Sequence, residues 1–204
     1  ASVAVDPAMS LSFDVLGTKP SCQLFQMTAD DFFANHDLRT YMPQGPDICF
    51  LDGMHRFEFL LRDFMNTEKA CRPNSIIFMH DCLPISPRLA ARGSGMKPAV
   101  DAKRAIDPAI KGWTGDVFKI LPILARYRPD LSVYPLDCPT TGLVMVTGLD
   151  PTSDVLNRRY NEIVREFAET ETQPGWFDTF YDSITIHSTR KMLLPGVLTT
   201  YCWL

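Results

Sequence analysis

DICFLDGMHRF, residues 47–57, and SIIFMHDC, residues 75–82, decide the fold class of this chain. Each stretch is an apolar run of strand length that stops abruptly at aspartate and histidine, side chains that a buried strand does not accommodate. Between them, apolar residues recur at i, i+3, i+4 and i+7 over residues 56–71, which predicts an amphipathic helix. Strand, helix and strand in this order predict a parallel pair joined by a right-handed crossover.

The chain upstream continues the same alternation. Residues 2–5 and 22–27 are short apolar runs that predict two further strands. Thr28 follows the second of them and is a candidate N-cap, because acidic residues occupy the first turn of the helix predicted after it.

The chain downstream closes the sheet. A helix is predicted to start at Thr114, with Pro122 expected to kink it. Residues 131–138 and 141–149 predict an antiparallel hairpin. We therefore expect an α/β domain over residues 1–150, and a C-terminal helix with an irregular extension, residues 151–204, packed on the same domain.

Composition excludes several classes of function. The chain has 204 residues, of which 46% are hydrophobic and 22% charged, as in an ordinary globular protein. A net charge of −4 argues against nucleic acid as the main partner, and no apolar run approaches the ~20 residues of a membrane span. Its 6 cysteines are scattered without a C-x-x-C pair, which favours a reduced cytoplasmic protein without a zinc site.

Polar side chains follow each predicted strand. In open α/β sheets the ligand lies beyond the carboxyl ends of the strands. Six residues just past such ends should therefore converge on one rim of the sheet: Asp6, Thr28, Asp52, His55, His80 and Asp81.

The run from residue 47 to residue 82 resembles the second half of class I S-adenosylmethionine-dependent methyltransferases. It is most similar to a bacterial branch whose fourth strand ends in D-G-x-H and whose fifth ends in H-D. VAVDP resembles the second strand of that family and FQMTADDFF the third, while residues 113–146 resemble its last crossover helix and closing hairpin. The resemblance covers residues 3–150 and implies a Rossmann-like methyltransferase sheet, mostly parallel with a C-terminal antiparallel hairpin.

The departure from the family lies at its first strand. That strand carries a Gly-rich turn, E-x-G-x-x-x-G or similar, which this sequence lacks ahead of residues 2–5. The missing strand is central in the family, so its two neighbours are expected to have unpaired main-chain groups. A longer parent protein, an unseen first segment and a filler from elsewhere in the chain all remain open, and GVLTTYCWL at the C-terminus is the one candidate filler.

The resemblance also implies cofactor contacts. Asp6 would accept hydrogen bonds from the ribose hydroxyls, because a carboxylate offers two acceptors to a vicinal diol. Thr28, Ala29 and Asp30 would lie against the adenine. The alternatives are an Asp-Pro turn that only ends a strand and a helix N-terminus with favourable acids.

Asp52, His80 and Asp81 are the candidate metal ligands, by resemblance to metal-dependent O-methyltransferases. A hard cation there would lower the pKa of an acceptor hydroxyl. Magnesium or manganese are the candidates, and the imidazole of His80 suits a softer ion than magnesium. His55, with Asp52 beside it, is the candidate general base for the acceptor. The alternatives are polar strand ends that satisfy one another and a solvent-exposed histidine.

The loop of residues 83–114 carries six cations against two aspartates. As a lid it would favour a small-molecule acceptor with a carboxylate or phosphate, and as a surface loop it would have no such role. Trp113 at its end would pack against the acceptor or anchor the core.

These patterns together predict methyl transfer from S-adenosylmethionine to an oxygen of a small molecule or sugar, assisted by a metal. The first alternative is a non-catalytic methyltransferase-like interaction module, with Trp176, Phe177, Phe180 and Tyr181 as an interface that a homodimer could use. The second is a metal-dependent hydrolase built on the Asp/His rim.

Overall fold

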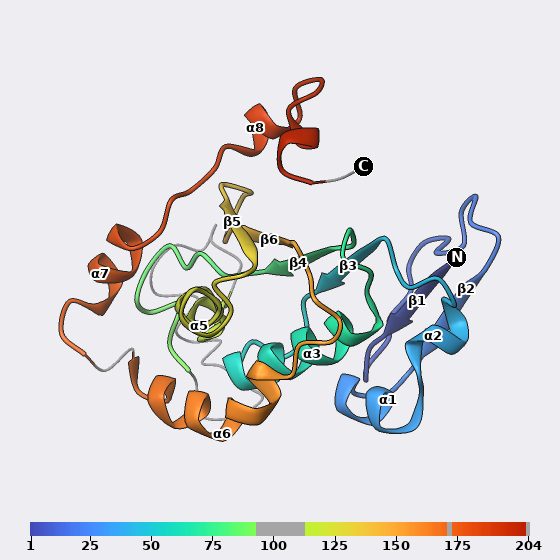
Figure 1. Cartoon of the computed structure of the whole chain (residues 1–204), viewed down its shortest axis with the longest axis horizontal. Coiled ribbons are helices and arrows are strands. Elements are labelled where there is room, and N and C mark those ends of the chain that lie inside the picture. The colour runs from blue at the N-terminus through green and yellow to red at the C-terminus, as the bar shows by residue number, and fades with distance from the viewer. Residues whose placement is uncertain (93–112, 171–172, 203–204) are drawn as a thin grey trace.

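The chain forms a mixed α/β molecule on two separate sheets, seen in a computed structural model that describes residues 1–92, 113–170 and 173–202 (Figure 1). The predicted α/β class is therefore confirmed. One continuous sheet is not observed, because no ladder of hydrogen bonds between the described strands joins the two sheets. Most of the basic loop 83–114, and with it the proposed lid, lies outside the described residues.

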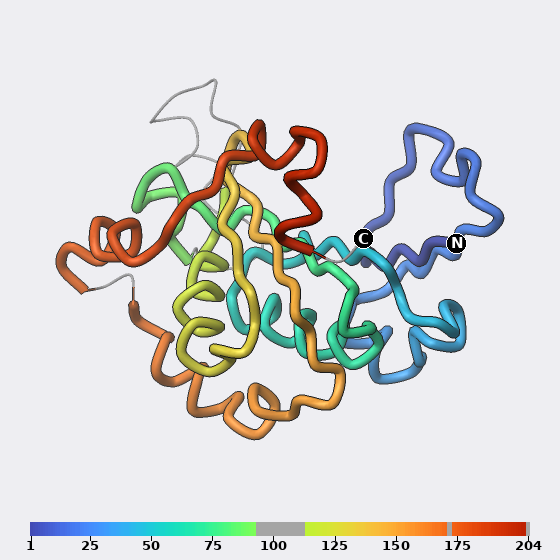
Figure 2. The backbone as a smooth tube through the Cα atoms, turned by 45° about the horizontal axis from the view of Figure 1, so that its top comes forward, coloured from blue at the N-terminus to red at the C-terminus, as the bar shows by residue number. Residues whose placement is uncertain are grey.

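The first sheet is a parallel pair of strands, β1 (Ser2–Val5) and β2 (Cys22–Phe25). The loop between these strands projects away from the rest of the molecule (Figure 2). Helices α1 (Ala29–Asn35) and α2 (Leu38–Tyr41) follow β2 in the chain.

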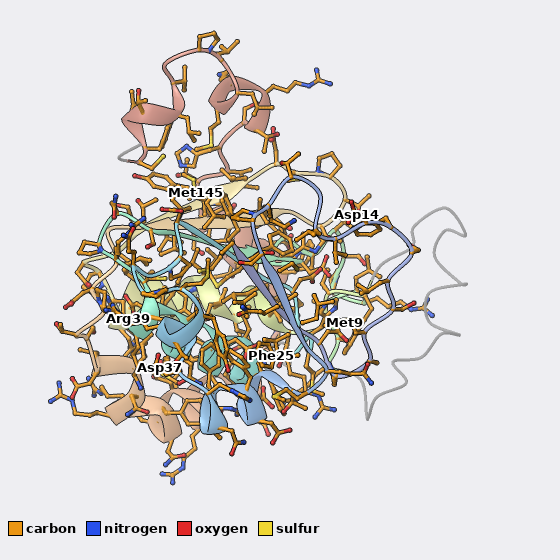
Figure 3. The ribbon with its side chains drawn as sticks, turned by 90° about the vertical axis from the view of Figure 1, so that its right-hand side faces the viewer. Met9, Asp14, Phe25, Asp37, Arg39 and Met145 are labelled. Carbon is orange, nitrogen blue, oxygen red and sulfur yellow. The ribbon has the colours of Figure 1, made fainter. Side chains whose placement is uncertain are left out.

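Aromatic packing attaches these helices to the first sheet. Phe25 of β2 is labelled in Figure 3. The centroid of its ring lies 5.0 Å from that of Phe32 in α1 and 5.0 Å from that of Tyr41 in α2. Thr28 caps α1 as predicted, since its hydroxyl accepts the N–H of Asp31 at 3.0 Å.

The second sheet has the strand order β3-β4-β6-β5. Strands β3 (Ile48–Leu51) and β4 (Ile76–His80) are parallel and are joined by α3 (Phe57–Ala70), as the opening stretch predicts. The hairpin of β5 (Ser132–Leu136) and β6 (Leu143–Thr147) is confirmed, with β6 antiparallel to both of its neighbours. β5 is an edge strand of this sheet, so Pro135, which has no N–H to donate, interrupts no hydrogen bond to a further strand.

Three helices cover one face of the second sheet (Figure 1). They are α3, α5 (Ile120–Tyr127) and α6 (Val155–Phe167), and a short 3-10 turn, η1 (Val117–Lys119), leads into α5. The expected start at Thr114 is wrong, because the Thr114 hydroxyl donates to the Leu89 carbonyl instead of capping the helix. The expected kink is also wrong, since Pro122 lies in the first turn of α5, where proline is tolerated.

The C-terminal segment covers the opposite face of the second sheet. Helix α8 (Thr189–Met192) and the 3-10 turn η3 (Leu198–Thr200) pack near Met145 of β6, and the Thr147 hydroxyl donates to the carbonyl of Tyr201 at 3.3 Å. The proposed filling of the missing strand position by GVLTTYCWL is therefore wrong for its described residues, because tertiary packing overrides their strand propensity.

The aromatic residues of α7 (Trp176–Asp182) do not form an exposed interface. Phe180 is buried, Trp176 stacks on Phe118 with ring centroids 4.7 Å apart, and the Tyr181 hydroxyl donates to the carbonyl of Pro84. These aromatics anchor α7 to the core, so the exposure on which the predicted interface depends is not observed.

A buried ion pair holds the helical layer at the end of the second sheet where β4 and β5 begin. Arg128 is 2% exposed and donates to Glu68 of α3 at 2.7 and 2.9 Å, and also to Asp130. Glu68 accepts in addition the N–H of Asp150 at 3.1 Å. Both charges are thus paired and hydrogen-bonded, as burial requires.

Candidate functional site

The carboxyl ends of β3 and β4 bring four polar side chains together. The Nε2 atom of His55 lies 3.4 Å from a carboxylate oxygen of Asp52 and 3.1 Å from one of Asp81. The Nδ1 atom of His80 lies 3.4 Å from both carboxylates. The predicted convergence of Asp52, His55, His80 and Asp81, here called the acid–imidazole cluster, is observed.

The orientation of His55 is set by a main-chain carbonyl. Its Nδ1 atom bonds the carbonyl oxygen of Trp113, which only accepts, so Nδ1 carries the proton. In the neutral ring, Nε2 then has a free lone pair and faces Asp52 and Asp81. A histidine held in this tautomer can accept a proton from a substrate or bind a metal.

The charges of the cluster shift the pKa values within it. Burial alone would lower the pKa of His55, but the neighbouring carboxylates of Asp52 and Asp81 outweigh burial and raise this pKa. The neighbouring imidazole of His55 lowers the pKa of Asp52, against a smaller opposing effect of burial. Asp52 is therefore ionised at neutral pH.

Asp81 is held in an unusual backbone conformation. Its φ is 60°, in the left-handed region that residues other than glycine rarely adopt, and its side chain is almost fully buried. The Thr141 hydroxyl, just ahead of β6, donates to its Oδ1 atom. Strain of this kind is typical of functional sites, and here it aims the carboxylate at His55 and His80.

The donor set of the cluster fits a metal ion. Asp52, His80 and Asp81 each offer one ligand atom, and these three atoms lie within 4.8 Å of one another. Nδ1 of His80 is buried and has no hydrogen-bond partner among the described residues, because the nearest carboxylate oxygens lie beyond normal hydrogen-bond length. Two carboxylates and an imidazole nitrogen are ligand types that divalent transition metals bind in proteins.

The four residues expected at the cofactor line one cavity of about 650 Å³. Asp6, Thr28, Ala29 and Asp30 contribute to its wall, and Asp52 does so from the other sheet. Asp52 thus belongs both to this cavity and to the acid–imidazole cluster, while His55, His80 and Asp81 do not line the cavity.

Local contacts limit what these residues can offer a ligand. The Thr28 hydroxyl is used in capping, and Arg62 of α3 binds both oxygens of Asp30 at 2.6 and 2.8 Å. The Arg62 hydrogen bond lowers the pKa of Asp30 despite its partial burial. One oxygen of Asp6 accepts the N–H of Ala8 at 2.7 Å, which leaves the other oxygen for a ligand.

Four residues that matter to the site were not predicted from the sequence. They are Arg62, Asp63, the carbonyl of Trp113 and Thr141. In the sequence, Arg62 and Asp63 fit the polar face of an ordinary amphipathic helix, so nothing marks them as site residues. The position of a main-chain carbonyl has no signature in the sequence.

The fold and the site define a mixed α/β protein with an acid–imidazole cluster at the carboxyl ends of two parallel strands. No protein-family model matches the sequence, and no match among curated proteins is found. A search of the described helices finds none with the length and apolar character needed to cross a membrane.

Proposed function

We propose that this protein transfers the methyl group of S-adenosylmethionine to a hydroxyl oxygen of a small molecule or sugar, on a Rossmann-like methyltransferase sheet. One observation carries the proposal. The residues expected at the cofactor, Asp6, Thr28, Ala29 and Asp30, line a single cavity that shares Asp52 with the acid–imidazole cluster.

The cofactor side of the proposal uses the polar end of the cavity. The free oxygen of Asp6 would accept a ribose hydroxyl, and the main chain of the turn at Thr28 and Ala29 would lie against the adenine. Bound S-adenosylmethionine supplies an electrophilic methyl group. Positioning of that group against the acceptor oxygen would provide most of the rate enhancement.

The acceptor side uses the cluster. His55 Nε2 would accept the hydroxyl proton as the new O–C bond forms and the S–C bond breaks, with the electron pair of that bond remaining on sulfur. Asp52, His80 and Asp81 would hold a divalent ion, manganese in preference to magnesium because of the imidazole. Such an ion lowers the pKa of a bound hydroxyl.

Titration calorimetry with the demethylated product, S-adenosylhomocysteine, tests the cofactor assignment. We expect Asp6→Ala to weaken binding at least tenfold. Asp14→Ala is the matched control, because Asp14 makes the same kind of turn in the same loop, accepting main-chain N–H groups at 2.9 and 3.2 Å (Figure 3). Absence of binding by the unaltered chain would overturn the proposal.

A metal-dependent hydrolase is the second candidate. The observation in its favour is that the three candidate metal ligands, Asp52, His80 and Asp81, include no residue of the turn at Thr28 that is assigned to the cofactor. A metal could therefore bind at the cluster without S-adenosylmethionine. Hydrolysis of a p-nitrophenyl ester in the presence of Mn²⁺ and without S-adenosylmethionine would favour the hydrolase over methyl transfer.

The cellular setting belongs to the same proposal. All six cysteines are free thiols in the structure, including the buried Cys71 and Cys82. We place the protein in a reducing compartment, the cytoplasm, with a small acceptor molecule as its partner in the reaction.

A further inference from the structure

Two cysteine sulfurs meet where β3 begins and α3 ends. The Sγ atoms of Cys49 in β3 and of Cys71, the residue after α3, lie 3.8 Å apart, which is hydrogen-bond distance for sulfur. All 6 cysteines lie within the described residues, and no second hydrogen bond between two thiols is found there. We call Cys49 and Cys71 the thiol pair.

Main-chain contacts on both sides of the thiol pair fix its position. The Ser75 hydroxyl donates to the carbonyl of Pro46 at 2.6 Å, and the N–H of Ile76 donates to the carbonyl of Asp47 at 3.0 Å. The chain just before the first cysteine is thus bonded to the chain just after the second. The fold itself, rather than one side-chain rotamer, therefore brings the two thiols together.

The thiol pair can close to a disulfide without a change in the main chain around it. The sulfurs of a disulfide are ~2.05 Å apart, so the two Sγ atoms must approach each other by less than ~2 Å. Rotations about the side-chain bonds of the two cysteines supply a movement of this size. The hydrogen bonds that hold the two segments together can then remain in place.

The two members of the thiol pair differ in access. Cys49 is partly exposed and contributes to the lining of the cavity, whereas Cys71 is fully buried. A small solute can therefore reach Cys49, but a bulky external thiol cannot reach Cys71. An oxidised Cys49 is accordingly expected to react with Cys71 and not with a second molecule.

The hydrogen bond within the thiol pair determines which sulfur ionises first. It lowers the pKa of Cys71, against the opposing effect of burial. The same hydrogen bond raises the pKa of Cys49, and burial acts in the same direction. Cys71 is therefore the member that becomes a thiolate, and Cys49 keeps the proton between the two sulfurs.

Two other buried cysteines have no partner thiol and are expected to react slowly. Burial raises the pKa of Cys82, and the negative charges of Asp81 and Asp52 add to this effect. Burial also raises the pKa of Cys202. Because oxidants react with thiolates, these two thiols should stay reduced while the thiol pair is oxidised.

We propose that Cys49 and Cys71 are a redox-active pair, which a small hydroperoxide converts to a reversible disulfide. In the first step the sulfur of Cys49 attacks the protonated oxygen of the hydroperoxide, while the Cys71 thiolate takes the Cys49 proton. An S–O bond forms, the O–O bond breaks, and its electron pair leaves with the alkoxide, which takes a proton from water. The product is a sulfenic acid at Cys49.

In the second step the sulfur of Cys71 attacks the sulfenic sulfur of Cys49. The S–S bond forms, the S–O bond breaks, and hydroxide leaves with the Cys71 proton as water. The two thiols are oxidised by two electrons in total, and the hydroperoxide is reduced to an alcohol and water.

The disulfide would enclose Asp52, His55 and α3 in a covalent loop. Such a cross-link stabilises a fold mainly by restricting the unfolded chain. In a reducing compartment a disulfide of this kind is transient, so the pair would stabilise the protein only while peroxide is present. This inference goes beyond the proposed function and does not rest on it, because the oxidation requires no methyl donor.

Limited oxidation of the full chain tests the proposal. The protein is treated with an equimolar amount of hydrogen peroxide, and the remaining thiols are alkylated. We expect peptide mapping to find Cys49 joined to Cys71, with a mass lower by two hydrogens. We also expect the midpoint of thermal unfolding to rise by at least ~4 °C, and dithiothreitol to reverse both changes.

Serine variants assign the two sulfurs. We expect Cys49→Ser to slow the consumption of hydrogen peroxide at least tenfold, and both Cys49→Ser and Cys71→Ser to abolish the rise in the unfolding midpoint. Cys138→Ser is the matched control, because Cys138 is also partly exposed but lies outside the thiol pair. Circular dichroism verifies folding, and if Cys71→Ser does not fold, Cys49→Ser and the mapping of the unaltered chain still decide.

Three outcomes would overturn the proposal. A sulfinic acid at Cys49 without a cross-link would mean that Cys71 does not react with the oxidised sulfur. A disulfide to another cysteine, or between two chains, would mean that the thiol pair is not selected. An unfolding midpoint that stays the same or falls when the disulfide forms would mean that the bond does not stabilise the fold.

Discussion

One carboxyl that lines the cavity, that of Asp63, makes the stability of the protein depend on pH. Burial, together with the negative charge of Asp30, raises the pKa of Asp63 to about 6, against the opposing charge of Arg62. Aspartate in an unfolded chain titrates near pH ~3.9. The folded protein therefore binds a proton on the Asp63 carboxyl more tightly than the unfolded chain does. The stability that this bound proton contributes is lost as the pH rises from ~4 to about 6.

We predict that Asp63→Asn stabilises the protein at pH 7 by up to ~3 kcal/mol and changes little at pH 3.5. The free energy of unfolding from urea titrations at the two pH values is the measurement. Asp178→Asn is the control, because Asp178 is an exposed aspartate on α7. Equal effects of Asp63→Asn at both pH values would contradict the prediction.

The unsatisfied nitrogen of His80 predicts a metal-binding phenotype. We expect His80→Ala to weaken Mn²⁺ binding at least tenfold in titration calorimetry, because it removes one of three ligand atoms. His187→Ala is the matched control, since His187 packs against Tyr134 outside the cluster. Unchanged Mn²⁺ affinity in His80→Ala would exclude His80 as a ligand.

The sequence predicts the residues of the cluster better than their contacts. Asp52 and His80 could be placed at one rim because the ends of parallel strands share an edge. The pairing of Asp30 with Arg62 and the bond between Trp113 and His55 could not, because each joins segments that only the folded chain brings together.

At the scale of elements, a glycine turn positions the histidine of the cluster. Gly115 has a φ of +56°, and a Cβ atom there would lie 1.8 Å from the carbonyl oxygen of His55. The segment before η1 can therefore approach the start of α3 only with glycine at this position.

We predict that Gly115→Ala costs more than ~4 kcal/mol of stability, because two backbone segments must move apart. Gly175→Ala is matched in backbone conformation, with φ +71°, but its Cβ would meet open space, so we expect a cost of ~1 kcal/mol. Urea unfolding of both variants is the measurement, and similar costs for the two would contradict the close approach.

Element types were predictable where the apolar pattern is strong, and boundaries where a side chain caps. The stripe of α3 and the cap at Thr28 are confirmed. The start of α5 was misjudged because Thr114, which resembles a cap, is bonded to Leu89, a partner remote in sequence. The end of the chain was misjudged because its β-favouring residues pack on a sheet face instead of extending a strand.

At the scale of the whole molecule, the buried pair of Arg128 and Glu68 ties α3 to the segment before β5. We predict that Glu68→Gln lowers the free energy of unfolding by ~3–5 kcal/mol, because it leaves a buried guanidinium without its counter-charge. Thermal and urea unfolding measure the effect.

An exposed ion pair provides the comparison. Arg158 of α6 and Asp154, the residue just before that helix, lie 2.9 Å apart at the surface, and Arg158→Gln is expected to change stability by less than ~0.5 kcal/mol. If Glu68→Gln also lowered the free energy of unfolding by less than ~0.5 kcal/mol, the stability of the protein would not depend on the buried pair.

The division of the molecule into two sheets was foreseen only in part. The order of predicted strands implied unpaired neighbours of an absent strand, but not whether the chain would close over them. The structure keeps the edges of β1 and β3 apart, with the helices α1 and α3 in contact on one side.

The pair of Arg128 and Glu68 lies where the strands begin, and the acid–imidazole cluster lies where they end. The buried ion pair and the cluster that we propose as the reaction site therefore lie at opposite ends of the second sheet. Because the two groups of residues share no contact, the effects on stability of substitutions in one and in the other should add.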